Sequence, residues 1–136
     1  MRQLIDRRWI RGQSVVEFSF TVAVLMVLVV LSAQVAIYLH YRNSLDLATK
    51  EGAFEAGLAG HTLQDGERTT YQLWAKLEPG GGTISVQAMR SGDLVIVTAK
   101  ATAPAILPVP IPPFNSVSVS SRAVHTIEVF QPGSGP

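Results

Sequence analysis

The chain of 136 residues is long enough for one small domain with an added anchor, but too short for two independent cores. It contains no cysteine, which excludes a disulfide framework, a thiolate metal site and a cysteine nucleophile. The net charge is +1, but four arginines and one aspartate give residues 1–12 a charge of +3, so the remainder carries −2 and nucleic-acid binding is not expected.

An apolar segment follows this basic start. From Phe18 to Leu39 the chain reads FSFTVAVLMVLVVLSAQVAIYL, 22 residues without a charge or a proline. As a helix this segment would extend for roughly 33 Å, enough to cross a bilayer. It is longer than the apolar core of a cleaved secretory signal and ends near Tyr38 and Tyr41. We therefore predict a single membrane span over about residues 18–41, with the arginine-rich amino end in the cytoplasm.

The helical pattern continues beyond the span, because residues 42–57 contain no proline and keep small or apolar residues at helical spacing. We predict one long helix over residues 13–57. Within it, Ala48, Gly52 and Ala53 would let a neighbouring backbone approach closely. That pattern fits packing against another subunit, and it equally fits an amphipathic helix that packs on its own domain.

One acid, Glu17, stands at the front of the apolar run. A carboxylate inside hydrocarbon is costly, so Glu17 is expected at the boundary, facing water, or beside a cation. One interpretation places it at the cytosolic headgroups, near the positive end of its helix. The other starts from the preceding residues, since the basic leader ends at Gly12 and QSVVEF, Gln13 to Phe18, follows. This spacing resembles a type IV prepilin processing site, where a membrane peptidase cuts after the glycine.

Cleavage between Gly12 and Gln13 would create an ammonium group at Gln13, one helical turn from Glu17. Opposite charges attract strongly in a low dielectric. If the acid of an incoming chain pairs with the amine of a neighbour, the pair would fix the axial register of helices stacked in a filament. Residues 1–12 are then the leader, and Glu17 and Phe18 are candidate assembly residues.

The stretch from Arg11 to Gly57 resembles the signature of the TadE/TadF-like minor pseudopilins of the tight-adherence (Tad, or Flp) type IVb pilus system. It combines the leader end, the acid–aromatic pair, the span, and a helix with Ala48, Gly52 and Ala53. The resemblance implies a subunit required for pilus assembly, and no enzyme. The implied partners are a prepilin peptidase, the major Flp-type pilin, other minor pseudopilins, membrane lipid, and the inner-membrane assembly platform with its cytosolic ATPase. The implied location is the bacterial cytoplasmic membrane, with the C-terminal domain outside the cytoplasm, or the extracellular pilus itself.

Residues 58–131 are expected to form a small extracytoplasmic domain, with a disordered tail at 132–136. Leu63 to Leu77 has an apolar helical face, acids near its start and a lysine near its end, which predicts a second helix. The following EPGGGT, residues 78–83, is a connector, because it lacks the lysine and hydroxyl residue of a phosphate loop.

Alternating apolar residues predict a hairpin of strands Thr83–Met89 and Leu94–Ala101, joined by the turn RSGD. The proline-rich stretch Ala103–Phe114 is expected to form an extended crossover. The last strand is predicted at Ser116–Phe130, and its polar SSRAVH stretch indicates a bulge or an edge. The fold class is therefore α+β, with a long N-terminal helix, a short second helix and a three-stranded antiparallel sheet.

No constellation of residues indicates catalysis. His40, His61 and His125 are scattered without zinc-ligand spacing, and the serines of residues 116–121 lie on a predicted strand and not at a nucleophile elbow. We therefore expect no metal, no cofactor and no enzymatic activity. The alternative function is an uncleaved single-pass membrane protein whose outer domain binds a ligand or an envelope partner, and this function requires neither Gly12 nor Glu17.

Overall fold

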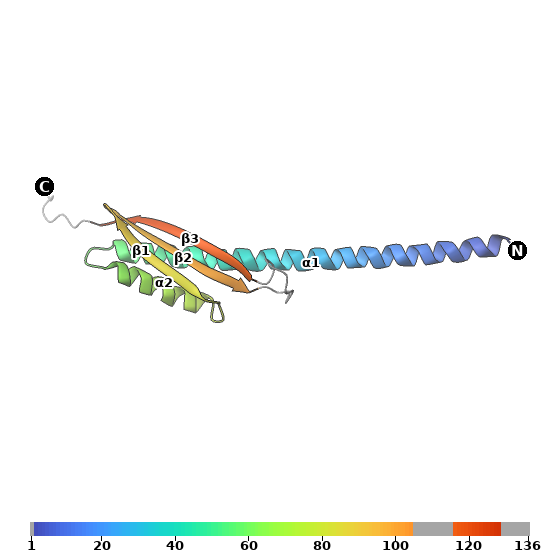
Figure 1. Ribbon diagram of the computed structural model, residues 1–136, viewed down its shortest axis with the longest axis horizontal. Coiled ribbons are helices and arrows are strands. Elements are labelled where there is room, and N and C mark those ends of the chain that lie inside the picture. The colour runs from blue at the N-terminus through green and yellow to red at the C-terminus, as the bar shows by residue number, and fades with distance from the viewer. Residues whose placement is uncertain (1, 105–115, 129–136) are drawn as a thin grey trace, which may run out of the picture. The chain divides into compact units, whose positions relative to one another are not determined.

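The computed structural model describes the backbone of residues 2–104 and 116–128. Most of the predicted proline-rich crossover and the predicted tail at 132–136 lie outside these residues. Five elements follow in chain order (Figure 1): α1 (Arg2–Gly57), α2 (Leu63–Leu77), β1 (Ile84–Ser91), β2 (Leu94–Pro104) and β3 (Ser116–Thr126). The α+β fold class is therefore confirmed. The chain divides into two compact units, residues 1–36 and 37–136, which are described separately.

The first unit consists of the N-terminal part of α1, which begins at Arg2 and so includes the predicted leader. The helix is long and apolar enough to cross a membrane, and no residue of its most apolar 18-residue window is buried inside the protein. Phe20 and Val29, for example, are 71% and 64% exposed. Side chains of this size and exposure are suited to hydrocarbon and not to water.

The second unit contains a three-stranded antiparallel sheet in the order β1-β2-β3. A two-residue turn joins β1 to β2, and its first central residue, Gly92, has φ 61°, a conformation that glycine adopts without strain. The pairing of β2 with β3 runs without interruption from Leu94 opposite Thr126 to Pro104 opposite Ser116. Of the two predictions for SSRAVH, the bulge is therefore wrong and the edge strand is correct.

The second helix and the C-terminal part of α1 lie on one face of this sheet (Figure 1). On β2 the buried residues that face the helices alternate strictly with exposed or half-buried ones, as expected for a strand with one face in the core. The buried core is built mainly from alanine and valine, and it comprises Leu45, Ala48, Ala53, Ala56, Trp74, Val86, Val95, Val97, Ala99, Ala101, Val119 and Ala123. Because these side chains are small, the layers must approach one another closely to exclude water.

Both edge strands lie against helices. On β1, the backbone amides of Val86 and Ala88 donate hydrogen bonds to the Tyr71 hydroxyl and the Glu67 carboxylate of α2, at 3.3 and 2.8 Å. On the other side, β3 follows α1. The Glu128 amide, just past β3, donates to the Gly57 carbonyl at 2.9 Å, which satisfies one of the free carbonyls at the end of α1.

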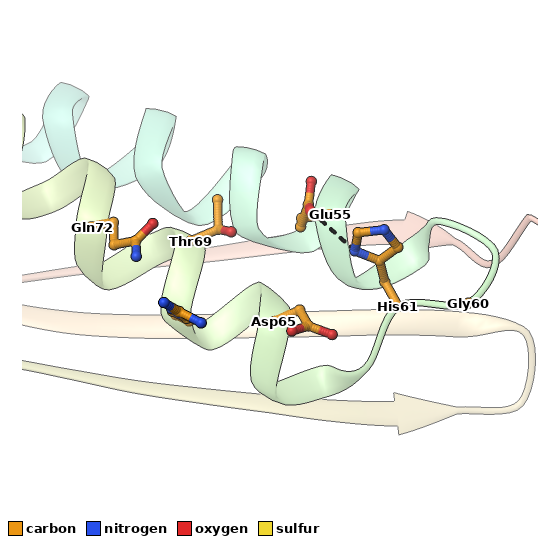
Figure 2. A pocket seen from close by; sticks show the side chains of 7 residues that line it. Glu55, Gly60, His61, Asp65, Thr69 and Gln72 are labelled. Atoms are coloured by element: carbon orange, nitrogen blue, oxygen red, sulfur yellow. Dashed lines mark ion pairs between the residues drawn. The ribbon is translucent and has the colours of Figure 1, made fainter.

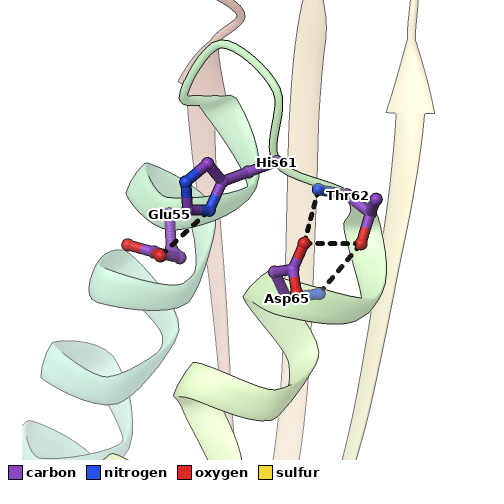
Figure 3. A network of polar contacts seen from close by, with 4 residues as sticks. All are labelled: Glu55, His61, Thr62 and Asp65. Atoms are coloured by element: carbon purple, nitrogen blue, oxygen red, sulfur yellow. Dashed lines mark hydrogen bonds and ion pairs between the residues drawn. The ribbon is translucent and has the colours of Figure 1, made fainter.

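Helix α2 begins at a reciprocal cap (Figure 3). The Thr62 hydroxyl accepts a hydrogen bond from the Asp65 amide at 3.3 Å, and the Asp65 carboxylate accepts one from the Thr62 amide at 2.8 Å. The Thr62 hydroxyl also donates to this carboxylate, at 2.7 Å. The hydrogen bonds from the Thr62 side chain and then from its backbone lower the pKa of Asp65. The ionised carboxylate therefore stabilises the start of α2.

This cap makes part of the domain's stability dependent on pH. Because the folded pKa of Asp65 lies below the unfolded value of about 3.9, its contribution is complete above that pH and is lost as the pH falls through the folded pKa. We expect the free energy of unfolding, measured by urea denaturation in detergent micelles, to fall less steeply below about pH 4 in Asp65→Asn than in the wild type. The control Glu51→Gln removes an exposed carboxylate outside any cap. Parallel acid profiles for wild type and Asp65→Asn would contradict this role.

Candidate assembly site

The residues of the predicted processing site all belong to one stretch of α1. Gly12 and Gln13 lie within the helix, and the side chain of Gln13 is outside the part of the chain that the structure describes. Glu17 and Phe18 follow on the same helix with exposed side chains, Phe18 at 70%. Glu17 lies four positions after Gln13, about one helical turn or 6 Å of rise. The backbone at Gln13 and the acid at Glu17 are therefore near enough for a terminal amine and a carboxylate to interact.

Polar side chains within the apolar segment bond to their own helix. The Thr21 hydroxyl donates to the Glu17 carbonyl, and the Ser32 hydroxyl donates to the Leu28 carbonyl, each at 2.8 Å. A hydroxyl that bonds one turn back has its own donor satisfied within the helix. This segment can thus face hydrocarbon without exposing those donors.

The three predicted packing residues, Ala48, Gly52 and Ala53, lie inside the second unit. A Cβ atom added at Gly52 would lie 2.6 Å from the Gly66 carbonyl oxygen of α2. A Cβ added at Gly66 would lie 2.5 Å from the Gly52 carbonyl oxygen and 2.6 Å from Ala56 Cβ. Helices α1 and α2 therefore cross with their backbones almost in contact. The structure thus uses these small residues in the packing of α1 on its own domain.

Glu78 was not identified from the sequence, although it joins α2 to α1. It follows the last residue of α2, and its side chain is only 7% exposed. Its carboxylate accepts a hydrogen bond from the Ser44 hydroxyl at 2.7 Å and lies 3.0 Å from His40 Nε2. A buried carboxylate needs such partners, because it has lost its contact with water. His40 therefore has a structural partner in this chain.

A polar cleft of about 330 Å³ lies where α1 ends and α2 begins (Figure 2). Figure 2 shows His61 beside Glu55, and their Nδ1 and Oε1 atoms are 3.0 Å apart. Asp65, which also lines the cleft, is occupied by the helix cap. Among the described residues, no cluster of three or more histidine, cysteine, aspartate or glutamate side chains could hold a metal ion. Glu55, His61 and Asp65 are therefore used in structural contacts.

Comparison with known proteins identifies the segment that carries the candidate residues. Residues 12–53 match the model of a family described as TadE-like protein, which confirms the resemblance inferred from the sequence over this segment. No curated protein and no solved structure gives a match. The matched segment begins at Gly12 and includes Glu17, Phe18 and the packing residues up to Ala53. A TadE-like segment implies a protein associated with a Tad pilus, and the family is not one of enzymes.

The crossing of α1 and α2 predicts a large effect from one methyl group. Gly66→Ala places that group against backbone and a buried alanine, neither of which can rotate away. Overpacking usually costs about 1–3 kcal/mol, and rigid neighbours at 2.5 and 2.6 Å place this cost in the upper half of that range. The cost therefore exceeds the gain of about 1 kcal/mol from replacing a helical glycine by alanine. We expect the free energy of unfolding, from urea denaturation in detergent micelles, to fall by about 1–2 kcal/mol.

The matched control is Gly80→Ala, because a Cβ at Gly80 has no atom within 4 Å. This variant should be as stable as the wild type or slightly more stable. The close crossing would be disproved if Gly66→Ala and Gly80→Ala had the same effect.

Proposed function

We propose that the chain is a minor pseudopilin required for assembly of a Tad (Flp) pilus, and that a prepilin peptidase matures it by cleavage after Gly12. The observation that carries this proposal is the TadE-like match over residues 12–53, whose first residue is the predicted cleavage position. The exposed apolar helix that follows supports retention in the membrane after cleavage. Residues 1–12 are then a leader that keeps the amino end in the cytoplasm until processing.

Cleavage after Gly12 would create a positive charge with which the Glu17 carboxylate can pair. Cleavage converts the amide nitrogen of Gln13 into an ammonium group about one turn from the Glu17 carboxylate, both in this chain and at the surface it offers to a neighbour. Inside hydrocarbon this attraction is far stronger than in water, and an unpaired acid is costly. Helices that enter a filament in the wrong register would hold the acid away from this amine, so the pair selects one register.

The second unit would lie outside the cytoplasm, attached to the membrane through the same helix α1. Its core already uses Ala48, Gly52 and Ala53. Contacts with the major Flp-type pilin and other minor pseudopilins would therefore involve the apolar surface of residues 14–36. The assembly platform in the inner membrane, with its cytosolic ATPase, completes the expected set of partners.

Processing is tested by the mass and amino-terminal sequence of the chain recovered from membranes of its native cells. We expect loss of residues 1–12 and a new terminus at Gln13, with the full-length chain retained when the peptidase gene is deleted. A Gly12→Leu variant should also stay full length and remain in the membrane, because the span is unchanged. An intact Met1 in wild-type cells would instead support the uncleaved single-pass alternative.

The register role is tested by Glu17→Ala. We expect normal membrane insertion and cleavage but at least a hundredfold less pseudopilin-dependent piliation, since removing one member of a buried ion pair costs about 3–5 kcal/mol. Membrane fractionation and counts of pili by electron microscopy measure the two effects separately. Glu51→Ala, at an exposed position of the same helix, is the control and should be piliated normally. Wild-type piliation in Glu17→Ala would rule out the pair as the register device.

A further inference from the structure

A second cleft, of about 390 Å³, lies between α1 and the edge strand β3 within the second unit. From α1 it is lined by Leu39, Arg42, Asn43 and Asp46, and from β3 by residues 120–122. Most of these side chains are hydrogen-bond donors, namely two guanidinium groups, two serine hydroxyls and one amide. The lining is therefore suited to a ligand with several acceptor oxygens.

The single acid of this cleft is already paired. Asp46 lies 2.7 Å from Lys50 Nζ, and it accepts a hydrogen bond from the Ser121 hydroxyl at 3.1 Å. By contrast, the described residues place no carboxylate within ion-pair distance of Arg42 or Arg122. Neither guanidinium group forms a direct ion pair among the described residues, although the charge of Arg42 also acts on Asp46. Both can therefore contact a further anion, and guanidinium binds phosphate oxygens in a bidentate manner.

The position of the cleft along α1 relates it to the membrane surface. Leu39 is the last residue of the uncharged segment and also lines the cleft. Arg42 and Asn43 lie three and four residues further, about 4.5–6 Å along the helix axis. The headgroup layer on each side of a bilayer is about 5–7 Å thick, so these donors fall at the depth of the phosphates.

We propose that this cleft binds the phosphate headgroup of an anionic phospholipid in the leaflet next to the domain. Arg42 and Arg122 contact the phosphate oxygens, the Ser120 hydroxyl and the Asn43 amide supply further donors, and Leu39 contacts the start of the acyl region. A lipid is favoured over free phosphate because the cleft begins at an apolar residue of the span. An anionic lipid is favoured over a zwitterionic one because its headgroup brings no cation toward the two arginines. The inference rests on the membrane span alone and not on processing or pilus assembly.

The test uses the full chain in detergent micelles supplemented with equal amounts of phosphatidylglycerol and phosphatidylcholine. Native mass spectrometry then counts the lipids that remain bound after the detergent is removed. We expect the wild type to retain phosphatidylglycerol in preference to phosphatidylcholine, and Arg42→Gln/Arg122→Gln to retain roughly tenfold less, since hydrogen bonds to charged groups are among the strongest. The control Arg68→Gln/Arg90→Gln removes the same charge outside the cleft and should bind as the wild type does.

Each other outcome would overturn the proposal. Equal retention of the two lipids by the wild type excludes selection of an anionic headgroup. In a parallel sample with added inorganic phosphate, retention of phosphate without any lipid preference assigns the cleft to a soluble ion. If the cleft variant and the control lose the same amount of bound phosphatidylglycerol, the loss results from the lower overall charge and not from the cleft. Near-ultraviolet circular dichroism checks that both variants are folded. The wild type and the variants can also be purified from cells that lack the peptidase. Lipid binding by these unprocessed chains is then measured independently of the pilus proposal.

Discussion

The folded domain depends on the close approach of two helices at Gly52 and Gly66. Its buried side chains are mostly alanine and valine, which reach only a short distance from their backbones. Such residues can fill the space between layers only if the layers lie close together. The glycine pair makes this distance possible, and Trp74, the largest side chain in the core, fills the remaining space beside Tyr41. Larger residues at the crossing would separate the helices and admit water.

Helix α1 distributes its residues according to what each part contacts. From Phe18 to Leu31 its large apolar side chains are exposed, whereas from residue 44 onward its small residues are buried in the domain. A domain of this size has a small core. The C-terminal part of α1 supplies a large part of its helical layer and therefore contributes much of that core. Helix α1 therefore contributes to both units, as the exposed apolar segment of the first and as part of a layer in the second.

The elements of the fold were largely predictable from local patterns, and the long-range contacts were not. Helix α2 was predicted with its observed bounds because its apolar spacing and acidic first turn are local signals. Strand β2 continues to Pro104, beyond its predicted end at Ala101, because a proline is tolerated at the end of a strand. The partners of Glu78 lie 34 and 38 positions earlier in the chain, so no local pattern indicates them.

In the candidate site, the order of Gly12, Gln13, Glu17 and Phe18 is a linear motif and could be read directly. The contact of Gly52 with Gly66 could not be predicted in this way, because it forms only when α2 folds back onto α1. A glycine inside an otherwise regular helix, as Gly66 is in α2, was the available signal for a close backbone approach. The cleft between α1 and β3 depends on chain segments about 80 positions apart and therefore had no sequence signature.

The hydrogen bonds from β1 to Tyr71 and Glu67 have a consequence for crowded conditions. Free amides along an outer strand form a template on which an unrelated chain can add a further strand, and such addition leads to aggregation. Here two of those amides are already bonded to side chains of α2. The domain is thus protected against the addition of a further strand at β1, without a charged or proline residue on that strand's outer edge having to supply the protection.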